Sequence, residues 1–169
     1  LLTNYLIIII SISNNNYVLI DLRIIFRKSS WKNNTNGSRN VGLGYQSLFS
    51  NTVGTDNIAL GDSALYNNTT GVKNIGIGRD ALKDNTTGIR NTAIGDAALR
   101  ESVSATNNTA VGYSALLNNT TGINNTSVGS EALTDNTTGQ GNVAMGHEAL
   151  KENTSGAFNT ALGKSALKD

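Results

Sequence analysis

Asparagine is the residue whose spacing in this chain could do the most chemistry. Eight asparagines stand 17 residues apart, and each begins one repeat. We number the residues of each repeat from 0 to 16, so that this Asn is position 0. A side-chain amide both donates and accepts hydrogen bonds, so Asn side chains at a constant spacing can bond to one another. The predicted Asn ladder consists of Asn40, Asn57, Asn74, Asn91, Asn108, Asn125, Asn142 and Asn159.

A second set of asparagines, at position 11, suggests a different chemistry. Five of these asparagines begin an Asn-x-Thr/Ser sequon, which accepts N-linked glycans in secreted proteins. The alternative is that Asn-Thr-Thr is turn chemistry and that the sequons are accidental. The candidate glycosylation sites are Asn68, Asn85, Asn119, Asn136 and Asn153.

Acidic residues and the single histidine give no catalytic constellation. Asp84 and Glu101 share position 10 of neighbouring repeats, and paired carboxylates can hold Ca²⁺. Lys83 and Arg100 stand beside them, which favours ordinary charge balance. His147 occupies a variable position and is predicted to be a solvated turn residue. The chain has no Cys, so it has no thiolate metal site. We predict no enzyme activity, no cofactor and no metal.

The fixed period predicts the elements that carry these side chains. A repeat this short cannot bury an apolar face alone, so its copies must stack as a solenoid. Position 3 is always aliphatic and position 8 is always Leu, which predicts two core columns. The predicted structural core consists of Leu43, Leu48, Leu60, Leu65, Ile77, Leu82, Ile94, Leu99, Val111, Leu116, Val128, Leu133, Met145, Leu150, Leu162 and Leu167.

Each repeat is predicted to be one coil with two short strands and two turns. Gly at position 4 allows a bend, and Asn-Thr-Thr-Gly at positions 11–14 is typical of a turn. The fold class is therefore all-β, a parallel β-solenoid of eight 17-residue rungs. The alternative is a strand-plus-short-helix solenoid, because residues 79–85 and 147–153 contain helix-forming residues. The small residues at positions 2 and 7 fit either a narrow coil interior or further chains packed along a shared axis, and the thin core favours the association of chains.

Two segments differ from the regular array, which fills residues 40–169 with the last copy incomplete. Residues 1–39 have another composition and are predicted to be a cap or a disordered linker. Their apolar runs, 6–10 and 17–26, are shorter than the roughly 18–20 residues of a membrane span. In the fourth copy, Ser102-Val103-Ser104-Ala105 replaces Asn-Thr-Thr-Gly. The missing Gly, which favours positive φ, predicts a weak point there.

The unit Asn-Thr-Ala-Ile-Gly, at residues 91–95, resembles the head repeats of YadA-type trimeric autotransporter adhesins. Together with Asn-Thr-Thr-Gly it is similar to repeat arrays of bacterial surface proteins and of phage or viral tail fibres. The resemblance covers residues 40–169 and implies a left-handed β-roll, a homotrimer and an extracellular, cell-surface or virion location. It also implies adhesion, with a host glycan or receptor as partner.

The function predicted from these observations is a non-enzymatic structural repeat, the shaft or head of a surface adhesin or tail fibre. One alternative is a carbohydrate-binding or carbohydrate-active fibre segment. Another is a glycosylated extracellular filament subunit. The predicted partner is a second copy of the chain, in a homotrimer or in end-to-end stacking. A formal net charge of +1 gives no reason to expect nucleic acid.

Overall fold

The computed structural model describes residues 33–168, and the predicted N-terminal cap or linker lies mostly outside this range. Within it the chain forms eight strands of three residues each and no helix. The strands are β1 (Val41–Leu43), β2 (Ile58–Leu60), β3 (Ile75–Ile77), β4 (Thr92–Ile94), β5 (Thr109–Val111), β6 (Thr126–Val128), β7 (Val143–Met145) and β8 (Thr160–Leu162).

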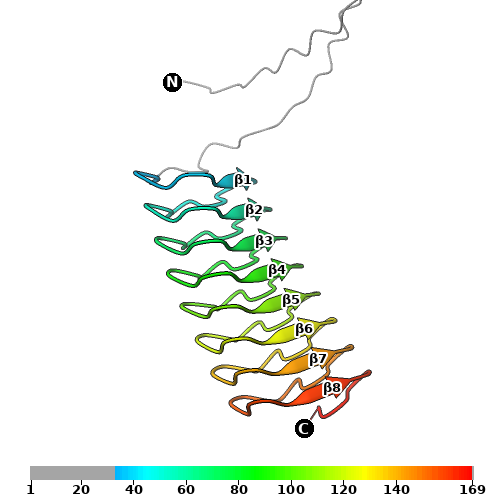
Figure 1. Cartoon of the computed structure of the whole chain (residues 1–169). Helices are drawn as coiled ribbons and strands as arrows, with labels where there is room; N and C mark the ends of the chain where they lie inside the picture. The colour runs from blue at the N-terminus through cyan, green and yellow to red at the C-terminus, as the bar shows by residue number, and fades with distance from the viewer. Residues whose placement is uncertain (1–32, 169) are drawn as a thin grey trace, which may run out of the picture.

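The eight strands form one parallel sheet in the order of the sequence, β1 to β8. Val41 pairs with Ile58 and Gly42 with Ala59, so each residue lies beside its equivalent in the next repeat. Figure 1 shows the result as a stack of similar coils, with one strand from each coil on the same side. The all-β parallel solenoid predicted from the period is confirmed.

Each coil bends at position 4, where only glycine fits. Gly61 has a φ of 139°, a conformation that L side chains rarely adopt. A Cβ on Gly61 would also collide with the carbonyl group of Gly78 in the next coil. The glycine column therefore permits both the bend and the close stacking of coils.

Other bends place non-glycine residues in the left-handed region, which explains why no helix forms. In residues 79–85, Asp80 and Leu82 have φ of 56° and 52°, so no run of right-handed residues can build up. The Leu82 N–H donates to Ala98 O at 3.0 Å, in the next coil rather than one turn back. Residues 147–153 follow the same pattern. The strand-plus-short-helix alternative is therefore wrong for this part of the chain.

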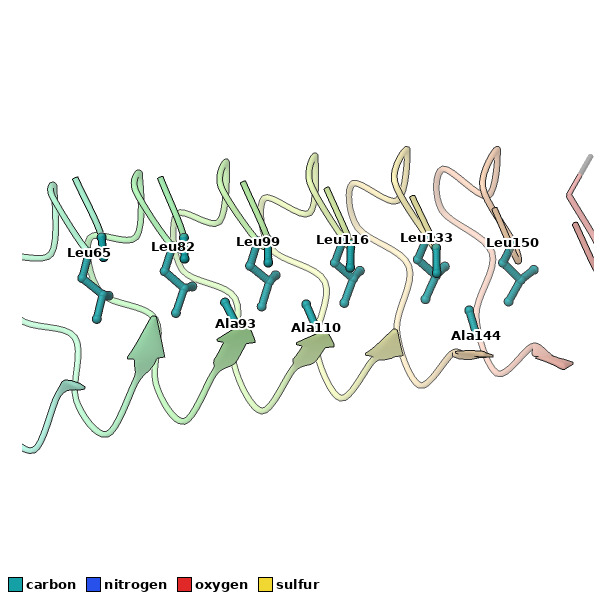
Figure 2. Packing of buried hydrophobic residues seen from close by; sticks show 14 of the residues in the cluster. Leu65, Leu82, Ala93, Leu99, Ala110, Leu116, Leu133, Ala144 and Leu150 are labelled. Atoms are coloured by element: carbon teal, nitrogen blue, oxygen red, sulfur yellow. The ribbon is translucent and has the colours of Figure 1, made fainter. Parts of the chain in front are cut away.

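The core is a narrow space between the position 8 leucines and the small residues of the strands. Leu65, Leu99 and Leu133 are fully buried. Figure 2 shows the leucines in one row, facing Ala93, Ala110 and Ala144 from the strands. The alanines of position 7 complete the buried cluster. Burial of the leucine column is confirmed, except for Leu167 in the last coil, which is exposed.

The prediction that position 3 forms a second core column is wrong. Every strand buries its middle residue, position 2, and turns positions 1 and 3 outward. The interior is so narrow that a Cβ on Gly76 would lie 3.1 Å from the backbone oxygen of Ala81 and 3.5 Å from Leu65 Cγ. Only small side chains fit opposite the leucines. Position 3 is exposed at Leu43, Ile94, Met145 and Leu162, and half-buried at Leu60, Ile77, Val111 and Val128.

The stack begins before the predicted boundary at residue 40. The N–H groups of Thr35, Asn36 and Gly37 donate to Thr52 O at 3.0, 3.0 and 3.1 Å. Asn34-Thr35-Asn36-Gly37 repeats the turn motif of the array one period before Asn51. Residues 34–39 are therefore the end of a preceding coil rather than a linker.

Candidate functional site

The position 0 asparagines form the predicted ladder along the stack. The Asn57 N–H donates to Asn40 Oδ1 at 2.9 Å, and the Asn74 N–H donates to Asn57 Oδ1 at the same distance. The Asn57 Nδ2 donates to Gly71 O at 2.8 Å, within its own coil. Because each amide ties two coils together and also closes its own coil, this column holds both the stacking and the shape of the rung.

A second Asn ladder runs through position 11, where glycan acceptors were predicted. The Asn68 Nδ2 donates to Asn51 Oδ1 at 2.8 Å and to Gly71 O at 3.2 Å. The Asn136 Nδ2 donates to Asn119 Oδ1 at 2.7 Å. These amides bond along the stack, as at position 0. The constant spacing of position 11 is the signal that could have predicted this second ladder.

The glycosylation prediction is wrong for the folded solenoid. Asn68, Asn85, Asn119 and Asn136 are fully buried. Asn153 is half-buried, and its Nδ2 donates to Asn136 Oδ1 at 3.0 Å. A glycan attached to Nδ2 would displace these hydrogen bonds, and it could reach solvent only by displacing the packed residues around the Asn side chain. Sequons occur here because Asn-Thr-Thr builds the corner of each coil.

The corner that follows position 11 concentrates hydrogen bonds on one oxygen. The N–H groups of Thr52, Val53 and Gly54 all donate to Thr69 O, at 3.0, 3.2 and 3.2 Å. The Thr52 hydroxyl donates to the same oxygen at 3.0 Å. Position 14 requires glycine at Gly54, because a Cβ there would collide with the Asn51 side chain. The glycine of Asn-Thr-Thr-Gly is thus required for close approach and not for a positive φ.

The outward face of the sheet, formed by positions 1 and 3 of β1 to β8, carries exposed aliphatic side chains. Val41 is 52 % exposed and Leu162 78 %. Between these ends, Ile94 and Met145 continue the exposed aliphatic column. Exposed apolar side chains that gather on one face are typical of interaction sites in soluble proteins. We call these two columns the outer sheet face.

A charged cluster crosses the last three coils. Lys151 Nζ lies 2.6 Å from Glu131 Oε2 and 2.9 Å from Glu148 Oε1. Lys168 Nζ lies 3.2 Å from Glu148 Oε2. Hydrogen bonds from Lys151 and then Lys168 lower the pKa of Glu148 to about 2. The carboxylates of Glu131 and Glu148 raise the pKa of Lys151, so the Lys151–Glu148 ion pair stays charged across the neutral range.

The remaining polar candidates do not converge. His147 Nδ1 lies 3.8 Å from Glu148 Oε2 at the surface. Asp84 Oδ1 accepts a hydrogen bond from Asn67 Nδ2 at 2.9 Å. Among residues 33–168 no three His, Cys, Asp or Glu side chains are grouped as metal ligands. In the same range no helix has the length and apolarity needed to cross a membrane.

The ladders, the glycine bends and the leucine column together define a parallel β-solenoid of stacked, nearly identical coils. No protein-family model, curated protein or solved structure matches this chain.

Proposed function

We propose that this chain is a non-enzymatic structural repeat that forms the shaft or head of a surface adhesin or tail fibre and serves attachment. In this proposal the rungs are 17 residues long and wind left-handed, and three chains associate side by side outside the cell or on a virion. The resemblance of residues 91–95 to adhesin head repeats supports the winding and the location.

The observation that carries the proposal is the outer sheet face. All eight strands contribute aliphatic or Thr side chains to it, and Val41, Leu43, Ile94, Met145 and Leu162 remain well exposed. The core behind this face holds one large side chain per coil, so the chain buries little apolar surface alone. Covering the outer sheet face with other copies would add the apolar burial that a single chain lacks.

Sedimentation of the full chain tests the association. The unmodified chain is expected to sediment as a trimer. A variant with Ile94→Lys and Val111→Lys places two charges on the outer sheet face and is expected to be a monomer with the same β circular dichroism. Thr121→Lys, at an exposed corner away from that face, is the matched control and should stay trimeric.

Two outcomes would overturn the association. One is a well-folded monomer of the unmodified chain at micromolar concentration. The other is a trimer that is equally stable with and without the two lysines, because that trimer would have to use another surface.

A further inference from the structure

The buried polar atoms without hydrogen-bond partners gather at one level of the stack. Within residues 33–168 these atoms are Asn85 Oδ1, Arg100 Nε and Ser102 Oγ. All three belong to the third and fourth coils. Both Asn85 and Ser102 are fully buried, so they cannot bond to bulk water instead.

The cause is a break in the position 11 ladder. Ser102 stands where the other coils have Asn, and its shorter side chain makes no hydrogen bond to Asn85 or Asn119. The Asn119 Nδ2 consequently bonds only to Gly122 O, at 3.0 Å, because the preceding coil has no Asn at position 11. The ladder is divided into Asn34, Asn51, Asn68 and Asn85 on one side and Asn119, Asn136 and Asn153 on the other.

A second substitution keeps the break in place. Ala105 occupies position 14 of the fourth coil, where most other coils have Gly. A Cβ at Gly88, the same position one coil earlier, would collide with Asn85 Oδ1. Asn at position 11 and Ala at position 14 therefore exclude each other, so Ser102 and Ala105 act as a matched pair. Val103 also lacks the hydroxyl that other corners bond to the next coil.

The opposite side of the same coil is continuous. β4 pairs with both β3 and β5 in full register. The Asn91 N–H donates to Asn74 Oδ1 at 3.0 Å, and the Asn108 N–H donates to Asn91 Oδ1 at 3.1 Å. The sheet and the position 0 ladder thus pass through the fourth coil unchanged while the position 11 ladder does not.

We propose that the fourth corner, residues 102–105, is a hinge built into the solenoid. The corner opens before any other interior corner, because fewer hydrogen bonds oppose its opening and the desolvated Asn85 and Ser102 gain partners from water when it opens. The intact sheet holds the two halves of the stack together on the other side. The stack therefore bends at this level, away from the broken ladder, and is stiffer above and below it.

Native-state hydrogen exchange of the full chain, expressed as protection factors, tests the hinge. The Val103 and Ser104 N–H groups donate to Thr120 O, and the equivalent groups of Thr120 and Thr121 donate to Thr137 O. The first pair is expected to exchange faster than the second. A variant with Ser102→Asn and Ala105→Gly completes the ladder and should slow exchange at residues 103 and 104 about tenfold.

Transplanting the hinge is the matched control. Asn119→Ser with Gly122→Ala, made in the repaired chain, should move the fast exchange to residues 120 and 121. Ser102→Asn alone should speed exchange, because its amide collides with the Ala105 methyl group. Equal protection of the fourth and fifth corners in the unmodified chain would overturn the proposal. Repair of both residues without any slowing would also overturn it.

Discussion

At the scale of the residue, the same amino acid gave one correct and one incorrect prediction. The asparagines of position 0 were expected to bond along the stack, and they do. The asparagines of position 11 were expected to carry glycans, yet they form a second ladder. The sequon is a local motif that suggests a surface site, whereas the period places identical side chains in contact.

Replacing a ladder amide with a carboxylate should be severe. In Asn136→Asp, an oxygen replaces the Nδ2 that donates to Asn119 Oδ1 and Gly139 O. Acceptors then face acceptors in a buried site, so we expect a loss of about 3 kcal/mol in the free energy of unfolding. Urea denaturation measures this loss of stability. The control is Thr138→Asp at an exposed position, which is expected to change the free energy of unfolding by less than about 0.5 kcal/mol.

Glycan occupancy should follow exposure rather than the number of sequons. When the chain is secreted from eukaryotic cells, the folded and soluble fraction should carry no glycan on Asn68, Asn85, Asn119 or Asn136, because each is buried. Four other sequon asparagines are exposed, so any glycans should be found on Asn33, Asn36, Asn107 and Asn124. Peptide mass spectrometry checks this, and a folded product glycosylated at Asn119 would contradict it.

At the scale of the element, the two aliphatic columns should respond differently to charge. Leu99 is fully buried, whereas Ile94 is 39 % exposed on the strand opposite. Leu99→Asp is expected to prevent folding, since an unpaired buried charge costs several kcal/mol. Ile94→Asp should leave the coil folded. Circular dichroism with thermal unfolding separates them, and a cooperative, soluble Leu99→Asp variant would contradict the position of the leucines.

The cluster around Glu148 should make stability depend on pH. Its pKa lies near 2, below the ordinary value of 4.5, so the unfolded chain takes up a proton before the folded chain does. The stabilisation is complete above about pH 5 and is lost as the pH falls through 4.5 towards 2. Glu148→Gln should therefore lower the unfolding temperature at pH 7 but not at pH 2. An equal effect at both would exclude the ion pairs as the cause.

Much of this architecture follows from the period, and one part does not. A constant spacing of 17 residues predicts stacked coils, and unbroken Leu at position 8 predicts their core. The side of each three-residue strand that faces the core differs from the prediction, because aliphatic residues flanking Ala suggest that the aliphatic side faces inward. The opposing leucine and the position 7 backbone together decide which side faces inward, since they leave space for little more than a methyl group. That competition for volume is not visible in any single repeat.

At the scale of the whole molecule, every coil is bound to the next by hydrogen bonds that run along the stack. Tension applied to the chain ends along that axis would load one coil boundary at a time, so the coils would peel off in succession. Each released coil of 17 residues would lengthen the chain by roughly 50 Å, the extended length minus one strand spacing. Optical tweezers should record a series of equal steps at low force. A stack built in this way would yield gradually under a sudden pull instead of breaking at once.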